Sequence, residues 1–464
     1  MNAKINPRIA IPLTALLLLI HACSLPTFSP ETQVTAARLP SPWPTPTITA
    51  SATTPDPQDA PTSTPIDLSP EVQAQMETLE NQTITLRGLV PTGPVERNLL
   101  SSEELRQYVL DDLLADYSPE EATIDTHVLS LLGLLEPGFD LLTLYIDLYS
   151  EQVAGFYDPI AKQLFVVSGA TFGGTAQMSY VHEYTHVLQD QVYDLQYGLE
   201  YDDQACDQDS ERCAAILALI EGDAMLVSEQ WLRTYATDQD LADIFADALE
   251  MESPVLLGAP DFLKEDLLFP YIHGLAFVRQ LYLSGGWAAV DAAYLNPPLS
   301  TEQILHPERY PNDRPIDLVV PGSITDHLDQ GWTELDWGVI GEWYFRLMLA
   351  QHLPTDIATA AAAGWGGDYY LAFYNQELGA GALVFVTIWD LMRDASSAFS
   401  AMRDYGDARF GEHGGSRYSP WWETEQAYAL LEGTSKQTLW IVAPDSNTAQ
   451  ALRQAIAFPA SSDD

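Results

Sequence analysis

One short motif constrains this chain more than any other feature, because it places two histidines on one face of a helix. Residues 182–186 read His-Glu-Tyr-Thr-His, within a stretch of helical spacing. Side chains four positions apart lie about one turn apart, so His182 and His186 can bind one Zn²⁺. Glu183 is then angled toward a water on that metal and can accept its proton. We expect a helix over about 178–195; the alternative is two unconnected surface histidines.

A zinc site needs a third protein ligand, and two carboxylates compete for that role. Glu221 ends an apolar run that begins at Ala214, and Gly222 follows it. An ionised carboxylate that faces a core is costly unless it is paired or bound to a metal, which favours Glu221; a salt-bridged or edge-exposed acid is the alternative. Gly222 would let this helix approach its neighbour closely. Asp190, one turn beyond His186, is the rival, and we favour it as an acceptor that orients an imidazole N–H.

Three stretches of the chain together carry a resemblance to a known family: Gly155-Phe156-Tyr157-Asp158-Pro159, the motif at 182–186, and Glu221-Gly222-Asp223-Ala224. The set resembles gluzincin-type zinc metallopeptidases, and more closely a group of poorly characterised bacterial secreted or lipoprotein members. The resemblance implies that His182, His186 and Glu221 bind zinc and that Glu183 is the general base. It also implies that the hairpin strand at Leu164–Val167 forms the cleft edge and pairs with a substrate backbone. The thermolysin-like pattern has an Asp four residues after the ligand Glu, where this chain has Met225.

Acyl hydrolysis also needs a hydrogen-bond donor for the developing oxyanion. We rank Tyr271 and His306 first as candidates and His273 behind them, because similar tyrosines and histidines serve this role in gluzincins. A buried, hydrogen-bonded tyrosine or a loop histidine is the structural alternative for each.

The N-terminus is typical of an export signal over residues 1–22. A basic start precedes an apolar stretch at 9–20, which is too short to span a bilayer as a helix. Ala22-Cys23 ends this stretch and resembles the lipobox of bacterial lipoproteins, which implies an acylated Cys23 and an extracytoplasmic, lipid-anchored protein. An ordinary cleaved signal with an incidental cysteine is the alternative.

The segment that follows, 23–70, is predicted to be a disordered linker that begins with the anchor cysteine. Residues 24–70 hold 11 prolines among 47 residues, with many Ser and Thr, and such a composition favours extended polyproline conformations over a packed core. The whole chain has 20 basic and 66 acidic side chains, a formal net charge of −46. This charge repels phosphate backbones, so we expect no nucleic-acid partner.

Two further cysteines fit an extracytoplasmic compartment. Cys206 and Cys213 are seven positions apart, and outside the cytoplasm such a pair can form a disulfide. A cysteine–metal site is the alternative, and the lack of a nearby histidine disfavours it.

Apolar periodicity predicts an α+β protein in two folded parts. The larger part, 71–365, is predominantly helical after a short extended piece, with a hairpin over 153–167 and helices over about 214–231, 239–251, 272–284 and 339–363. The smaller part, 366–464, reads β-β-α-β-β-α and suits a ferredoxin-like layer.

These features favour a surface-tethered zinc metallopeptidase that hydrolyses peptide bonds in a peptide or protein substrate. Two alternatives stay open on the sequence. One is a surface-binding lipoprotein that keeps the fold without turnover, and the other is a zinc hydrolase that acts on a non-peptide amide.

Overall fold

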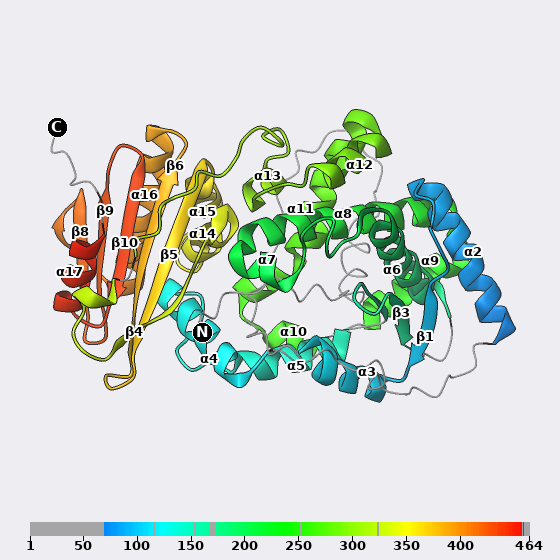
Figure 1. Ribbon diagram of the computed structural model, residues 1–464, viewed down its shortest axis with the longest axis horizontal. Helices are drawn as coiled ribbons and strands as arrows, with labels where there is room; N and C mark the ends of the chain where they lie inside the picture. The colour runs from blue at the N-terminus through cyan, green and yellow to red at the C-terminus, as the bar shows by residue number, and fades with distance from the viewer. Residues whose placement is uncertain are drawn as a thin grey trace.

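The structure is a computed structural model that describes residues 69–114, 117–152, 155–167, 172–250, 253–322, 324–456 and 458. The expected signal peptide, Cys23 and the linker as far as residue 68 lie outside the described residues. Figure 1 shows a helical region at one end of the molecule and a sheet at the other, so the predicted α+β class is confirmed. Within the described ranges, no helix is both long and apolar enough to cross a membrane.

The helical region comprises α2 (Pro70–Arg87), α3 (Ser102–Tyr108), the π-helical turn η1 (Val109–Leu113), α4 (Pro119–Leu132), α5 (Leu141–Gln152), α6 (Gly174–Tyr193), α7 (Asp203–Gln208), α8 (Ser210–Thr234), α9 (Asp238–Glu250), α10 (Pro254–Gly258), α11 (Asp261–Gly285), α12 (Trp287–Leu295) and α13 (Thr301–Leu305). The 3₁₀ turn η2 (Thr325–His327) packs against the sheet region. The described part of the helical region begins with a helix, α2. The reason is local: Ser69 caps the first turn by accepting from the N–H of Val72, and Pro70 occupies the first helical position, where its missing N–H costs nothing.

A small three-stranded sheet lies beside α6. Its strands are β1 (Glu96–Leu100), β2 (Gly155–Asp158) and β3 (Gln163–Val167), in the order β1-β3-β2. The predicted hairpin is confirmed, because β2 and β3 pair antiparallel. The prediction that Leu164–Val167 forms the cleft edge is wrong, because β3 also pairs in parallel with β1 and is the central strand. The edge strand of this hairpin is β2.

The sheet region comprises β4 (Trp332–Gly338), α14 (Gly341–Ala350), α15 (Thr355–Ala362), β5 (Trp365–Asn375), β6 (Ala380–Trp389), α16 (Met392–Phe410), β7 (Gly414–Ser416), β8 (Ser419–Glu423), β9 (Tyr428–Gly433), β10 (Gln437–Ala443) and α17 (Ser446–Ala455). Its seven strands are antiparallel, in the order β4-β5-β6-β10-β9-β8-β7. The first of them, β4, precedes the expected boundary at 365/366.

Both faces of the central strands are buried. On β6, Phe385 packs in the same cluster as Tyr405 of α16, whereas its neighbour Val384 packs in the same cluster as Leu452 of α17. Successive side chains of a strand point to opposite faces, so α16 and α17 cover opposite faces of the sheet. The ferredoxin-like prediction is therefore wrong, since that layer carries its helices on one face.

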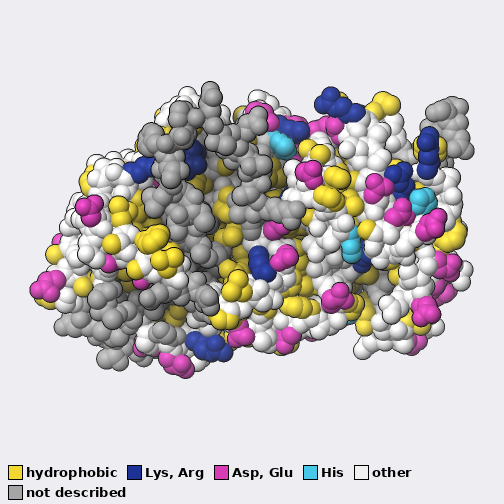
Figure 2. Space-filling model, turned by 180° about the vertical axis from the view of Figure 1, so that it is seen from behind, with side chains coloured by type: hydrophobic (Ala, Val, Ile, Leu, Met, Phe, Trp, Pro, Cys, Tyr) yellow, Lys and Arg dark blue, Asp and Glu magenta, His cyan; other side chains and the backbone are white. Residues whose placement is uncertain are grey.

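The charge of the chain is distributed over its surface. Figure 2 shows Asp and Glu side chains scattered over both the helical end and the sheet end of one face, with Lys and Arg between them. On this face, the acidity is a general property of the surface and does not mark a single site.

Candidate metal centre

Helix α6 runs through the interior of the helical region and carries the motif. It packs against α2, α8, α9, β2 and β3, and its residues from Met178 to Asp190 are all buried. His182 is 0% exposed and His186 is 7% exposed. Two surface histidines on a helix would be mostly solvated, so the alternative drawn from the sequence is excluded.

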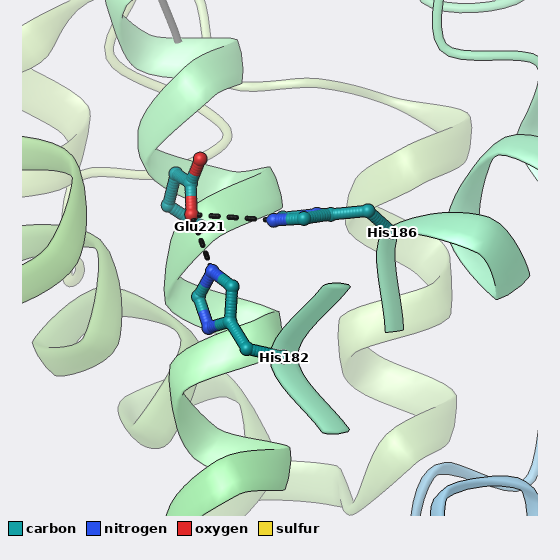
Figure 3. Close-up of side chains that lie close together, drawn as sticks. All are labelled: His182, His186 and Glu221. Carbon is teal, nitrogen blue, oxygen red and sulfur yellow. Dashed lines mark hydrogen bonds and ion pairs between the residues drawn. The ribbon is translucent and has the colours of Figure 1, made fainter. Parts of the chain in front are cut away.

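The motif histidines meet Glu221 of α8. The Nε2 atom of His182 lies 3.0 Å from Oε2 of Glu221, and Nε2 of His186 lies 3.4 Å from the same oxygen. Figure 3 shows the two imidazoles and the carboxylate pointing toward one another. Glu221 is only 2% exposed, so the sequence argument for a buried carboxylate at this position holds.

These three side chains suit a zinc ion. Each offers one ligand atom, and the three atoms all lie within 4.8 Å of one another. Two donors that bind one Zn²⁺ at 2.0–2.1 Å in a tetrahedral arrangement are about 3.3 Å apart, close to the distances found here. A set of two imidazoles and one carboxylate is also a ligand chemistry that catalytic zinc uses.

Ion pairs with Glu221 stabilise the charged forms of these side chains. Burial opposes the charge on each side chain. The neighbouring His186 and His182 nevertheless lower the pKa of Glu221 to about 2. Burial would lower the pKa of His186, but Glu221 and then Glu183 raise it to about 9. A carboxylate that remains ionised in the interior is an attractive ligand for a cation.

Glu183 lies next to this group with one oxygen held and the other available. The backbone N–H of Tyr157, on edge strand β2, donates to Oε2 of Glu183 over 3.1 Å. The other oxygen, Oε1, is buried and has no hydrogen-bond partner among the described residues. Burial, opposed by His186 and reinforced by Glu221, raises the pKa of Glu183 to about 8. A carboxyl group that titrates near neutrality can both accept and return a proton.

In the part of the chain that the structure describes, Asp190 accepts no hydrogen bond from the histidines of the metal group, the set formed by His182, His186 and Glu221. The prediction that it orients an imidazole N–H is therefore wrong. Its carboxylate accepts from the Tyr157 hydroxyl over 2.6 Å and from Nζ of Lys162 over 2.7 and 2.8 Å. The acceptor beside His186 is instead Gln189, whose Oε1 lies 2.8 Å from Nδ1. Asp190 fixes β2 and the following turn against α6, because both of its side-chain partners come from that hairpin.

Helices α8 and α11 cross closely at two glycines, as the sequence led us to expect for Gly222. A Cβ at Gly222 would lie 2.2 Å from the backbone of Gly274, and a Cβ at Gly274 would lie 2.1 Å from the carbonyl oxygen of Ala218. No side chain fits at that separation. The crossing brings α11 beside the helix that presents Glu221.

The three candidate oxyanion donors lie in different surroundings. Tyr271 of α11 is 3% exposed, and its ring centroid lies 6.3 Å from that of His182. His273 packs 5.1 Å from the rings of Phe269 and Trp343. The structure therefore brings Tyr271 to the metal group and places His273 in an aromatic cluster.

His306 belongs to a separate polar cluster. Its Nε2 lies 2.9 Å from Oε1 of Glu342 on α14, and this partner raises the pKa of His306 against the effect of burial. The same α13 segment joins α8 near Glu211, whose Oε1 accepts from the N–H of Thr301. Glu211 lies ten residues, or about 15 Å of helix, before Glu221, so the structure does not bring His306 to the metal group.

A second set of acids lies close to this cluster. Glu302, Asp313 and Asp390 offer oxygens within 4.8 Å of one another. Nη1 of Arg309 lies among them, in contact with Glu302 and 3.7 and 3.2 Å from Asp313 and Asp390. The guanidinium already supplies the positive charge, so we assign no metal to this set.

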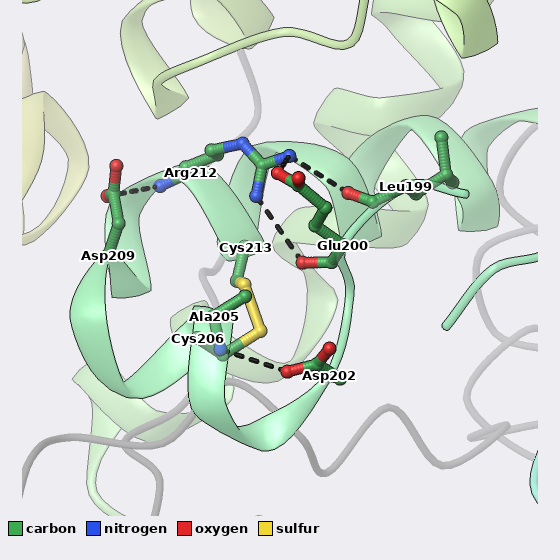
Figure 4. The surroundings of a disulfide bond; sticks show 8 residues. All are labelled: Leu199, Glu200, Asp202, Ala205, Cys206, Asp209, Arg212 and Cys213. Carbon is green, nitrogen blue, oxygen red and sulfur yellow. Dashed lines mark hydrogen bonds and ion pairs between the residues drawn. A yellow bond between two sulfur atoms is a disulfide. The ribbon is translucent and has the colours of Figure 1, made fainter. Parts of the chain in front are cut away.

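The disulfide between Cys206 and Cys213 is present and anchors the start of α8. It joins α7 to the first turn of α8. Figure 4 shows Arg212 beside it, donating to the carbonyl oxygens of Leu199 and Glu200. Glu221 follows about two turns later on the same helix, so these contacts fix the beginning of the helix that carries Glu221.

Four residues connect to His186 through hydrogen bonds and were not predicted from the sequence: Gln189, Asp223, Arg87 and Tyr294. The signal for Gln189 was its place three residues after His186, on the same helix face. The sequence offers no such signal for Arg87 and Tyr294, because they lie 136 and 71 positions along the chain from Asp223, the residue to which they donate.

Comparison with known proteins adds one match. A family model described as a domain of unknown function, DUF8575, matches residues 333–453. No curated protein and no solved structure matches the chain. The match spans most of the sheet region and contains none of His182, His186 and Glu221, so it carries no information on the metal group.

Proposed function

We propose that this chain is a zinc-dependent metallopeptidase that hydrolyses peptide bonds. The observation that carries the proposal is the buried convergence of His182, His186 and Glu221, with Glu183 beside them. Burying four ionisable side chains together is costly unless they serve one another or a ligand.

Glu183 and Tyr271 have distinct proposed roles beside the metal. A bound Zn²⁺ supplies a Lewis acid and lowers the pKa of water toward about 7. Glu183 takes and later returns a proton at Oε1, because Oε2 is held by the N–H of Tyr157. Tyr271, buried beside His182, is the donor we propose for the developing oxyanion.

Substrate would bind along β2. This strand ends its sheet, and extended peptides commonly pair with such an edge. Its Tyr157 N–H already faces Glu183, so a backbone aligned on β2 lies next to the proposed base. We further propose that the chain acts outside the cytoplasm, tethered through a lipid on Cys23, as its N-terminal sequence suggests.

The test compares the full-length wild-type protein with Glu183→Gln, which keeps the size of the side chain and removes the base. We expect one zinc per chain in both proteins. Cleavage of a peptide library should fall by about 10²–10⁴-fold in the variant, the usual contribution of a general base. Equal cleavage by both proteins would remove Glu183 from the mechanism.

The same experiment separates the alternatives. Zinc binding by the wild type with no cleavage of peptides or of simple amides would favour a binding lipoprotein. Cleavage of amides but not of peptides would favour a non-peptide amide hydrolase.

A further inference from the structure

A buried chain of polar contacts begins at Nδ1 of His186, the ring nitrogen that does not face Glu221. Oε1 of Gln189 lies 2.8 Å from Nδ1 of His186. Nε2 of Gln189 donates to the carbonyl oxygen of Ile220 over 3.0 Å and to Oδ2 of Asp223 over 3.2 Å. Gln189 and Asp223 are both 0% exposed, so bulk solvent does not reach these contacts.

The orientation of the Gln189 amide follows from its partners. A backbone carbonyl and a carboxylate only accept hydrogen bonds, so the amide nitrogen must face Ile220 and Asp223. The amide oxygen then faces His186 and can only accept from it. His186 must therefore carry a proton on Nδ1, so Nε2, the ring nitrogen that faces Glu221, is the atom at which a metal can replace a proton.

Asp223 is in turn held by an arginine from α2, the first described helix. Nε of Arg87, the last residue of α2, donates to Oδ1 of Asp223 over 2.8 Å, and Nη1 lies 2.8 Å from Asp291. The Tyr294 hydroxyl donates to Oδ2 of Asp223 over 2.9 Å. The Arg87 guanidinium also stacks on the Trp287 ring at 4.5 Å and is fully buried.

We propose that Gln189 is a positioning residue that fixes the metal-binding tautomer of His186, and that Arg87 supports it through Asp223. Helix α2, the first described element after the linker, thereby becomes part of the metal centre. This inference rests on the proposed zinc site and does not require that the protein cleave peptides.

The chain offers a matched control for Arg87. Arg346 is also buried, pairs with Glu265 and stacks on an indole, that of Trp343, at 4.3 Å. None of these contacts involves α6 or Glu221. A change from arginine to methionine at either position removes a buried guanidinium from an indole, and only the change at Arg87 disturbs Asp223.

The test measures the affinity for Zn²⁺ by competition with a chromophoric chelator, and the visible absorption spectrum of the Co²⁺ complex. We expect Gln189→Met to weaken zinc binding by about 10–100-fold and to alter the Co²⁺ spectrum, as loss of an outer hydrogen bond to a ligand usually does. Arg87→Met should act in the same direction by about 3–10-fold. Arg346→Met should bind zinc like the wild type.

A rescue variant keeps the test decisive if Arg87→Met fails to fold. The single change Gln189→Glu keeps an oxygen that accepts from Nδ1 of His186, and the protonated form of its carboxyl group keeps an O–H that can donate to Ile220 or Asp223. We expect this variant to bind zinc more tightly than Gln189→Met.

Wild-type affinity in Gln189→Met, or an equal loss in Arg346→Met and Arg87→Met, would overturn the inference while the zinc site stands. A wild-type chain that binds no zinc would overturn the proposed function as well.

Discussion

The two ends of the molecule bury different chemistry. In the sheet region, the central strands bury apolar side chains on both faces, such as Phe385, Val384 and Trp440. In the helical region, α6 and α8 bury imidazole, carboxylate and amide groups against one another. An apolar core stabilises a fold without further partners. A buried polar set is costly unless every member is satisfied, so we propose that the helical region holds the functional site.

The largest effect on stability is expected from the sheet core. Trp440 is 0% exposed and packs against Trp422 and Tyr405. Trp440→Ala should lower the free energy of unfolding by about 3–5 kcal/mol, because it leaves a large cavity. Chemical denaturation measures this loss, and zinc content measured on the folded protein should not change. Loss of zinc in this variant would mean that packing around Trp440 also sets the geometry of His182, His186 and Glu221.

A smaller effect concerns the sheet region's buried Asp368. Its carboxylate accepts from the N–H groups of Ile340 and Gly341 and from the Trp365 indole, but burial outweighs these bonds and raises its pKa from 3.8 to about 7. Between these values the unfolded chain loses a proton that the folded chain keeps. Stability should therefore fall as pH rises from about 4 to 7, by about 2–4 kcal/mol, and stay level above pH 7.

The comparison that isolates this contribution is Asp368→Asn. Denaturation of the wild type and the variant across this pH range should show a shallower decline in the variant. The two curves should run parallel if Asp368 keeps an ordinary pKa, and that result would refute the prediction.

Two glycines sharpen the contrast between the regions further. A Cβ at Gly274 would strike the backbone of α8, whereas a Cβ at Gly433 in the sheet would approach the Phe399 ring at 2.7 Å. A ring can rotate away and a helix backbone cannot. Gly274→Ala should cost about 1–3 kcal/mol of stability and weaken zinc binding, while Gly433→Ala should cost less and leave zinc binding intact. Equal zinc affinity in both variants would show that the α8–α11 crossing does not set the position of Glu221.

The smallest effect is expected from the acidity that the two regions share. A net charge of −46 should favour neutral or basic peptides over acidic ones at low salt, by about ten-fold at most, and salt should remove the difference. Cleavage rates of peptides matched except for charge measure this preference. Faster cleavage of the acidic peptides at low salt would contradict it.

The sequence predicted the site better than its surroundings. The spacing of four between His182 and His186 fixes their shared face, and the apolar run before Glu221 indicates its burial, so the three donors follow from local pattern. Strand order does not follow from local pattern: β3 is central only because β1, 67 residues earlier, pairs with it. The support of Gln189 by Asp223 and Arg87 likewise depends on tertiary contacts between distant segments.

Zinc content tests the central claim most directly. Purified wild-type chain, loaded with Zn²⁺ and freed of excess metal, should retain one zinc per chain by elemental analysis. Glu221→Ala should retain less than about a tenth of that amount, because a ligand is lost. Asp190→Ala should retain nearly all of it, because Asp190 binds the β2–β3 hairpin and not the metal group. A wild-type chain without zinc, or greater zinc loss in Asp190→Ala than in Glu221→Ala, would contradict the account.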